Sequence, residues 1–101
     1  MPPLKMEWLQ QSKAQFEESR TRAMNAGQAE TFRRLHNEIA TALRDLHQAL
    51  EKGEVMYKPR RPGGEVRHWV LENISVWYVV FPREQIGWIL EYATTPHSWP
   101  N

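Results

Sequence analysis

The segment 74–81, with the sequence ISVWYVVF, is apolar on both of the faces that an extended strand presents. Successive side chains of a strand point to opposite sides, which gives the two sets Val76, Tyr78, Val80 and Trp77, Val79, Phe81. A strand with two apolar faces must be covered on both of them, and this is typical of a central position in a sheet. The chain must therefore supply neighbouring strands and a layer that packs on them.

Candidate strands lie on both sides of this segment in the sequence. They are rich in valine, isoleucine and aromatic residues, which favour strands, and they span residues 54–58 (EVMYK), 65–72 (EVRHWVLE) and 86–92 (IGWILEY). The segment PRRPGG, a tight turn at Asn73 and the segment PREQ separate them. The segment 4–8 (LKMEW) adds one more short strand at the N-terminus.

Residues 9–52 are rich in good helix formers, and Gly27 divides them into two helical segments. Ser12 followed by Gln15 predicts a capping box at the start of the first helix, and Gly27 suits its C-cap. The second helix has the stronger pattern, because its apolar residues recur at spacings of three and four: Phe32, Leu35, Ile39, Leu43, Leu46 and Leu50. We expect this helix to end at Gly53 and to form a hairpin with the first.

The sequence therefore predicts an α+β fold, in which a short N-terminal strand and a helix hairpin pack on one face of a small antiparallel sheet. The length of 101 residues suits a single domain over residues 1–101, with an irregular tail at 94–101. Two helices cannot easily cover both faces of such a sheet, so one face should stay at least partly open. Side chains on this open face matter most for function.

Composition narrows the possible functions. The formal net charge is +1, so any binding of nucleic acid must come from local clustering of basic residues. The chain has no cysteine, which excludes thiolate metal sites and suits a reducing cytoplasm. No apolar run approaches the roughly 20 residues of a membrane helix, and no glycine-rich phosphate loop or close metal-binding pattern occurs. We expect a cytoplasmic protein that needs neither a metal nor a cofactor.

A local basic cluster is the strongest functional signal in the chain. Its members fall within eleven residues and are Lys58, Arg60, Arg61, Arg67 and His68. Arginines placed across a sheet and its turn can hold phosphate in a bidentate manner, and Trp69 and Trp77 can stack on bases or fill a partner's groove. The alternative interpretation is that the arginines are solvated turn residues and that the tryptophans belong to the core.

The remaining histidines give weaker signals. His97 lies near the C-terminus, and an unperturbed imidazole has a pKa near 6.5, which suits proton transfer. His36 and His47 lie on the second helix, about three turns apart, so they cannot share a metal ion. We expect both of them to be solvated or partly buried helix residues without a chemical role.

The order of these elements resembles that of the RelE/ParE superfamily, which comprises toxins of bacterial type II toxin–antitoxin systems. Residues 5–18 (KMEWLQQSKAQFEE) are similar to the opening strand and helix of that family. Residues 46–80 are similar to the end of its helical part, its basic strand and the strand that carries a characteristic tyrosine, here Tyr78. Residues 86–93 (IGWILEYA) are similar to its apolar final strand.

The resemblance implies a RelE-like toxin that inhibits translation by ribosome-dependent cleavage of messenger RNA. In that role the catalytic residues would be Arg67, His68 and His97, and the phosphate- or RNA-binding residues would be Lys58, Arg60, Arg61 and Trp77. Cleavage requires that the 2′-hydroxyl lose a proton and that negative charge on phosphorus be stabilised. The resemblance also implies a cognate antitoxin as partner, bound through Trp69 and Trp77.

Departures from the family pattern keep two alternatives open. Many RelE-like nucleases have an arginine three residues before the strand tyrosine, and this chain has Ser75 there. The alternatives are a ParE-like inhibitor of DNA gyrase without nuclease activity and a non-catalytic protein-binding module of the same fold. Strand alternation also allows only one of Arg67 and His68 to face the open side of the sheet.

Overall fold

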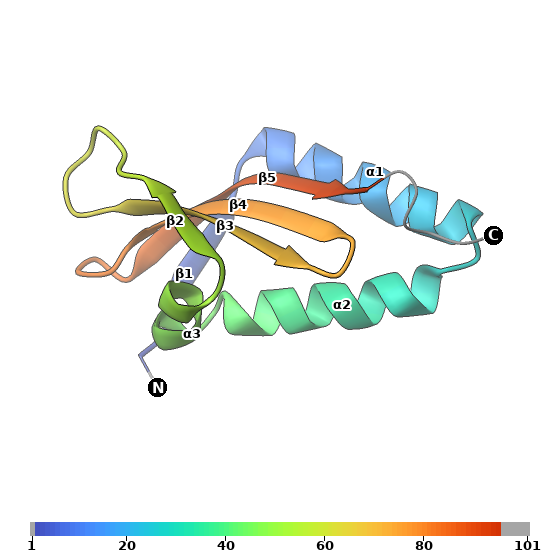
Figure 1. Cartoon of the computed structure of the whole chain (residues 1–101), viewed down its shortest axis with the longest axis horizontal. Coiled ribbons are helices and arrows are strands. Elements are labelled where there is room, and N and C mark those ends of the chain that lie inside the picture. Colours follow the sequence, from blue (N-terminus) through green and yellow to red (C-terminus); the bar gives the residue numbers. More distant parts are fainter. Residues whose placement is uncertain (1, 96–101) are drawn as a thin grey trace.

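The computed structural model describes residues 2–95 and has an α+β fold in which helices pack against a five-stranded sheet (Figure 1). In chain order the elements are β1 (Lys5–Trp8), α1 (Gln10–Asn25), α2 (Ala29–Ala42), α3 (Leu46–Glu51), β2 (Glu54–Tyr57), β3 (Glu65–Leu71), β4 (Ile74–Phe81) and β5 (Ile86–Thr94). The α+β class predicted from the sequence is confirmed. None of the helices within the described residues combines the length and the apolar character needed to cross a bilayer.

The strand order in the sheet is β1-β5-β4-β3-β2, so β4 occupies the predicted central position. Strands β2 to β5 form an antiparallel meander, whereas β1 pairs with β5 in parallel. The sheet is therefore mixed rather than purely antiparallel. A parallel pair requires a long crossover between its strands, and here nearly the whole chain lies between β1 and β5. This pairing fixes the N-terminal strand at the edge opposite to β2.

The helices cover one face of the sheet and form the main core with it. Helices α1 and α2 both run along the long axis of the molecule (Figure 1). The fully buried side chains of this core come from α2, the segment after it, β4 and β5, and they include Leu35, Ile39, Leu43, Ile74, Val76, Tyr78, Val80 and Tyr92. Because Val76, Tyr78 and Val80 point into this core, the alternate residues of β4 point to the other side.

That other side, opposite to the helices, is called the open face below. It carries a smaller apolar cluster from β3, β4 and β5, made by Val66, Trp77, Val79, Phe81, Ile86, Trp88 and Leu90. Val79 and Phe81 are buried there by their neighbours on the sheet, although no helix covers them. The tryptophans Trp77 and Trp88 remain half-buried. The open face is thus apolar and aromatic rather than strongly charged.

The predicted capping box at Ser12 and Gln15 is wrong. Helix α1 begins at Gln10 after Leu9, which makes no side-chain capping hydrogen bond. Ser12 is buried, and its hydroxyl donates to the Leu9 carbonyl at 2.9 Å. The side-chain carbonyl of Gln15 accepts from the backbone N–H of Tyr92 at 2.9 Å. Ser12 thus satisfies a carbonyl at the start of α1, and Gln15 satisfies a backbone N–H of β5, so neither side chain caps the helix.

The predicted second helix is interrupted after Ala42, and a separate helix α3 starts at Leu46. Asp45 is the reason, because its carboxylate accepts from the backbone N–H groups of His47 at 2.9 Å and Gln48 at 3.5 Å. Aspartate is among the best N-cap residues, and in mid-helix it competes with the helical hydrogen bonds. The break lets α3 turn back under the start of β2 (Figure 1).

Two glycines with positive φ, Gly27 and Gly53, provide a test of how closely the segment between α3 and β2 approaches β3. Gly53 has φ of 67°, and a Cβ there would overlap the backbone carbonyl of His68. Gly27 has φ of 72° but nothing lies near such a Cβ. Gly27→Ala should lower the free energy of unfolding by about 1 kcal/mol from backbone strain alone. Gly53→Ala should lower it by about 3 kcal/mol or more, since steric overlap adds to strain. Denaturant unfolding of both variants measures this, and equal losses would contradict the close approach of Gly53 to β3.

Candidate functional site

The centre of the open face brings together His68, Trp77 and Ser75. His68 on β3 lies directly opposite Trp77 on β4, and their rings stack with centroids 4.5 Å apart and planes inclined by 21°. The Nε2 atom of His68 lies 2.6 Å from the Ser75 hydroxyl oxygen. All three residues are half-buried. Two of the residues predicted from the sequence, His68 and Trp77, therefore share one partly exposed site, and Ser75 completes it.

The chemistry available to this site is that of a hydrogen-bonded histidine–serine pair. The Ser75 hydroxyl and the His68 ring can each be donor or acceptor, according to the tautomer of the ring. Across the strands, Glu54 is the register partner of His68 and Glu91 is that of Trp77. Carboxylates on both sides favour a positive charge at this point and disfavour a phosphate group. The site thus combines an imidazole, a hydroxyl group and an indole ring, and its cross-strand neighbours are acidic.

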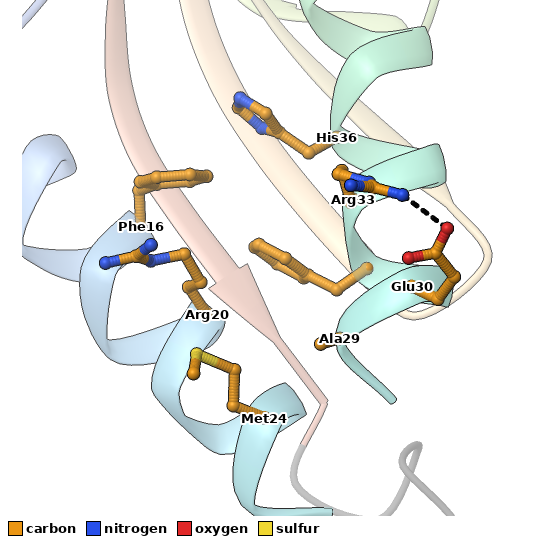
Figure 2. A pocket seen from close by; sticks show the side chains of 8 residues that line it. Phe16, Arg20, Met24, Ala29, Glu30, Arg33 and His36 are labelled. Atoms are coloured by element: carbon orange, nitrogen blue, oxygen red, sulfur yellow. Dashed lines mark hydrogen bonds and ion pairs between the residues drawn. The ribbon is translucent and has the colours of Figure 1, made fainter. Parts of the chain in front are cut away.

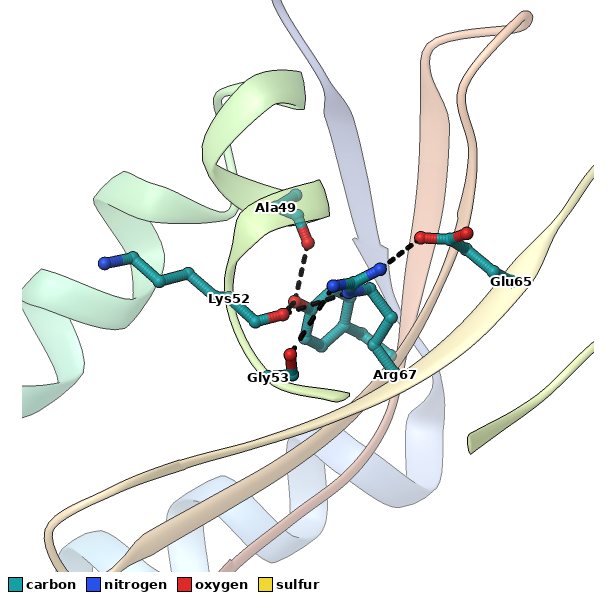
Figure 3. A network of polar contacts seen from close by, with 6 residues as sticks. Ala49, Lys52, Gly53, Glu65 and Arg67 are labelled. Carbon is teal, nitrogen blue, oxygen red and sulfur yellow. Dashed lines mark hydrogen bonds and ion pairs between the residues drawn. The ribbon is translucent and has the colours of Figure 1, made fainter. Parts of the chain in front are cut away.

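Arg67 lies on the other side of β3, facing the helices (Figure 3). Its Nε–H donates to the Lys52 carbonyl at 2.9 Å and its Nη2 to the Gly53 carbonyl at 3.4 Å, while Nη1 pairs with the Glu65 carboxylate. Only 8% of the residue is exposed. These bonds commit the guanidinium to the segment that joins α3 to β2. Arg67 therefore has a structural role here, and His68 is the residue of the two that faces the open side.

Tyr78 on the central strand reinforces the same connection. Its hydroxyl donates to the carbonyls of Ala49 at 2.7 Å and Lys52 at 3.0 Å (Figure 3). Burial raises the pKa of Tyr78 to about 12, although the nearby Arg67 guanidinium acts in the opposite direction. The phenol is consequently protonated at neutral pH and keeps its hydrogen to donate. Tyr78, which the family resemblance emphasised, thus joins the sheet to the C-terminal end of α3.

Trp69 does not lie on the open face. It points into the main core beside Val76, with 8% of the residue exposed, and Lys52 Nζ lies 5.7 Å from the centroid of its ring. The prediction that Trp69 contacts a partner is therefore not compatible with its position. The physical reason is the alternation of β3, which places Trp69 on the same side as Arg67 and opposite to His68.

The remaining predicted basic residues lie at one end of the sheet, in the loop between β2 and β3. Lys58 and Arg60 are exposed to solvent. The Arg61 guanidinium lies 4.4 Å from the centroid of the Phe81 ring and forms an ion pair with Glu84, with a shortest hydrogen bond of 2.5 Å. Its charge is therefore partly compensated. The predicted catalytic residue His97 lies outside the described residues.

A second concave candidate is the helix groove, a cavity of about 240 Å³ between α1 and α2. Figure 2 shows Phe16, Arg20 and Met24 reaching into it from α1, and Ala29, Glu30, Arg33 and His36 from α2. Arg20 bonds to Glu17 at 2.8 Å and Arg33 pairs with Glu30. Since these cations are paired along their own helices, the groove offers mainly apolar surface.

His36 differs from the other residues of the helix groove because its ring is packed among aromatic side chains and contacts the hydroxyl group of Tyr92. Its Nδ1 lies 3.0 Å from the Tyr92 hydroxyl, and the rings of Trp8, Phe16 and Phe32 surround it at centroid distances of 4.4 to 6.2 Å. Burial lowers the pKa of His36 below its ordinary value of 6.5, and the positive charge of Arg44 acts in the same direction. The imidazole is therefore neutral at physiological pH. Its position gives it a structural role in an aromatic cluster.

Local sequence signals exist for the contacts that were not predicted. The turn between β3 and β4 has two residues, so Leu71 pairs with Ile74 and Val70 with Ser75. This register puts Ser75 diagonally across from His68. Likewise, Phe32 and His36 are four residues apart on a helix and share one face. In the described part of the chain, no three His, Asp or Glu side chains gather closely enough to hold a metal ion.

Comparisons of this chain with protein-family models, with curated proteins and with solved structures find no significant match.

The structural role of Arg67 leads to a stability prediction. Arg67→Met removes the donors to the Lys52 and Gly53 carbonyls and leaves Glu65 without its cation, so it should lower the free energy of unfolding by about 2–4 kcal/mol. Arg60→Met, the same change at an exposed loop residue, should alter it by less than about 0.5 kcal/mol. Denaturant unfolding of the two variants measures the difference. Similar values for both would show that the Arg67 contacts do not stabilise the fold.

His36 leads to a prediction on pH dependence. Its folded-state pKa is lowered, so below about pH 6.5 the unfolded chain binds a proton that the folded chain resists. The contribution of His36 to stability is therefore present above about pH 6.5 and is lost as the pH falls through the lower folded pKa. His36→Gln should show a smaller loss of stability between about pH 7.5 and pH 5 than the unaltered protein. His47→Gln, at an exposed histidine, is the matched control and should keep the full slope; identical slopes for all three proteins would contradict the prediction.

Proposed function

We propose that this protein is the toxin of a type II toxin–antitoxin pair, similar to the RelE/ParE superfamily, and that it inhibits its target by binding rather than by cutting RNA. The order of its elements supports the first part. A short strand, a helix pair and an antiparallel meander follow one another, and the first strand returns beside the last one. The order of the elements agrees with the resemblance, whereas the parallel pairing of β1 with β5 was not part of the prediction.

The observation that carries the choice of binding over cleavage is the charge around His68 and Trp77. Phosphodiester cleavage builds negative charge on phosphorus, and positive groups at the site must stabilise it. Arg67 is bonded to carbonyls on the opposite side of the strand, and the register neighbours on the open face are Glu54 and Glu91. Partly exposed tryptophans such as Trp77 are instead typical of the central part of a protein interface.

The proposal implies two kinds of protein partner. A cognate antitoxin would cover the open face and keep the toxin inactive, as a segment that becomes ordered on binding. The inhibited target would be DNA gyrase, by similarity to the ParE branch. Both the antitoxin and gyrase are bacterial cytoplasmic proteins, and the proposal therefore includes a cytoplasmic location.

RNA cleavage on the ribosome is the second candidate, and one contact favours it. His68 Nε2 lies 2.6 Å from Ser75 Oγ, so the imidazole is positioned to exchange a proton with a hydroxyl group. A substrate 2′-hydroxyl that displaced Ser75 would meet the same nitrogen, and Trp77 would stack on a base. Lys58 and Arg60, exposed at the end of the sheet, would then contact the RNA backbone.

Inducible expression in bacteria separates these candidates. Binding predicts growth arrest without cuts in translated messages, together with inhibition of purified gyrase. Trp77→Ala should then weaken inhibition about tenfold or more, as truncation of an interface hot spot does. His68→Gln should retain arrest, because the amide keeps a hydrogen bond to Ser75 without transferring protons. Met24→Ala, at an exposed apolar residue on α1, is the control and should have no effect.

The contrary outcomes are equally specific. If translated messages are cut by the unaltered protein but not by His68→Gln, the binding proposal is contradicted and RNA cleavage is supported. Growth that continues unchanged on expression of the unaltered protein would contradict both toxin candidates and leave the protein-binding module. Circular dichroism of each variant ensures that a lost effect does not come from unfolding.

A further inference from the structure

Three polar side chains form a row across the open face, one on each of the adjacent strands β2, β3 and β4. Glu54 on β2 is the register partner of His68 on β3, and the hydroxyl oxygen of Ser75 on β4 lies 2.6 Å from His68 Nε2. Directly opposite residues of an antiparallel pair point to the same side of a sheet, so Glu54 shares the open face with His68. The row therefore has the order carboxylate, imidazole and hydroxyl group.

This order is suited to activating a serine as a nucleophile. A hydroxyl group is a weak nucleophile by itself, and it is activated by a base at about 2.6–3.2 Å that a third group orients. His68 Nε2 meets the distance requirement. Within residues 2–95, neither His68 Nδ1 nor the exposed Glu54 carboxylate has a hydrogen-bond partner, so the two are free to bind one another. An imidazole that donates from Nδ1 presents the lone pair of Nε2 to the hydroxyl group.

The surroundings of Ser75 define the kind of substrate. Trp77 follows two residues later on the same side of β4 and is half-buried, so its indole ring offers contact to an apolar or aromatic group. Its N–H has no hydrogen-bond partner within the described residues, and a free donor of this kind stabilises a carbonyl oxygen that gains negative charge. Glu54 and Glu91 flank the site, and their charge disfavours an anionic substrate. A small neutral ester with an aromatic part fits these conditions.

We propose that Ser75 is a nucleophile for small neutral carboxylic esters, with His68 as its base and Glu54 as the residue that orients His68. The Ser75 oxygen forms a bond to the carbonyl carbon of the ester, and the hydroxyl proton passes to His68 Nε2. The bond to the leaving oxygen then breaks, and this oxygen takes the proton from His68 and departs as an alcohol. Water attacks the acylated Ser75 in the same manner, which releases the carboxylic acid and the free serine.

The turnover expected of this site is slow, because a single side-chain N–H takes the place of the pair of backbone N–H groups in efficient serine enzymes. The inference does not rest on the proposed toxin function, which needs the Trp77 side chain but not the Ser75 hydroxyl group. Absence of acylation would contradict this inference alone, whereas absence of growth arrest would contradict the toxin proposal alone.

A fluorophosphonate probe tests whether Ser75 is activated, because the serine oxygen must replace fluoride on phosphorus while the base accepts its proton. Mass spectrometry of the labelled protein and its peptides should locate one adduct, on Ser75. Ser75→Ala should abolish labelling, and His68→Gln should slow it about tenfold or more. Thr21→Ala and His47→Gln, which alter an exposed hydroxyl group and an exposed imidazole on the helices, should label at the unaltered rate. An unlabelled protein or an adduct elsewhere would overturn the proposal.

Hydrolysis of p-nitrophenyl acetate, a neutral aromatic ester, tests turnover and the part played by Glu54. The unaltered protein should exceed Ser75→Ala in rate by about tenfold or more and should carry an acetyl group on Ser75 during turnover. Glu54→Gln should lower kcat about tenfold and leave KM unchanged, because Glu54 orients the base and does not bind the ester. Glu51→Gln, at an exposed glutamate of α3, is the matched control and should change neither constant.

Two results would contradict these assignments. Equal rates for the unaltered protein and Ser75→Ala would overturn the nucleophilic role of Ser75, and an unchanged kcat in Glu54→Gln would overturn the orienting role of Glu54. Circular dichroism of each variant distinguishes a lost reaction from a lost fold.

Discussion

The hydrogen bonds from Arg67 and Tyr78 to the end of the helical layer determine how the rest of the molecule is arranged. Both side chains come from the middle of the sheet, and both bind carbonyl groups between Ala49 and Gly53. They attach the central strand and its neighbour to the point where the chain leaves α3. Because these carbonyls lie in the last turn of α3 or just after it, they have no helical partner of their own and need donors. This attachment fixes the start of β2, and it also decides which side of β3 faces solvent.

The consequence for the site follows from strand alternation alone. Once Arg67 points toward the helices, His68 must point to the open face. There it meets Trp77, its register partner, and Ser75. The same alternation sends Trp69 into the core. The basic and aromatic residues of this segment are thus divided between the two sides of β3. Arg67 and Trp69 lie on the side of the helices and have structural roles. The open face keeps His68 and has few positive charges.

Much of the fold was predictable because its signals are local. The two-sided apolar pattern of residues 74–81 placed the central strand correctly, and the turns predicted the meander. The break after Ala42 was not predicted, because six regularly spaced apolar residues outweighed the single N-cap signal of Asp45. The parallel pairing of β1 was missed, because a strand of four residues carries no information about the direction of a partner some eighty positions away. In the site, alternation predicted that Arg67 and His68 would separate, but the side each would take depended on the distant carbonyls of Lys52 and Gly53.

The helical layer covers only one face of a strand that is apolar on both, and this asymmetry explains where the molecule can interact. On the open face, Val79 and Phe81 are buried by neighbouring strands, by the Arg61 side chain and by the loop at Gly64 rather than by a helix. Trp77 and Trp88 remain partly accessible, so a partner placed there would bury further aromatic area without displacing any element of the fold.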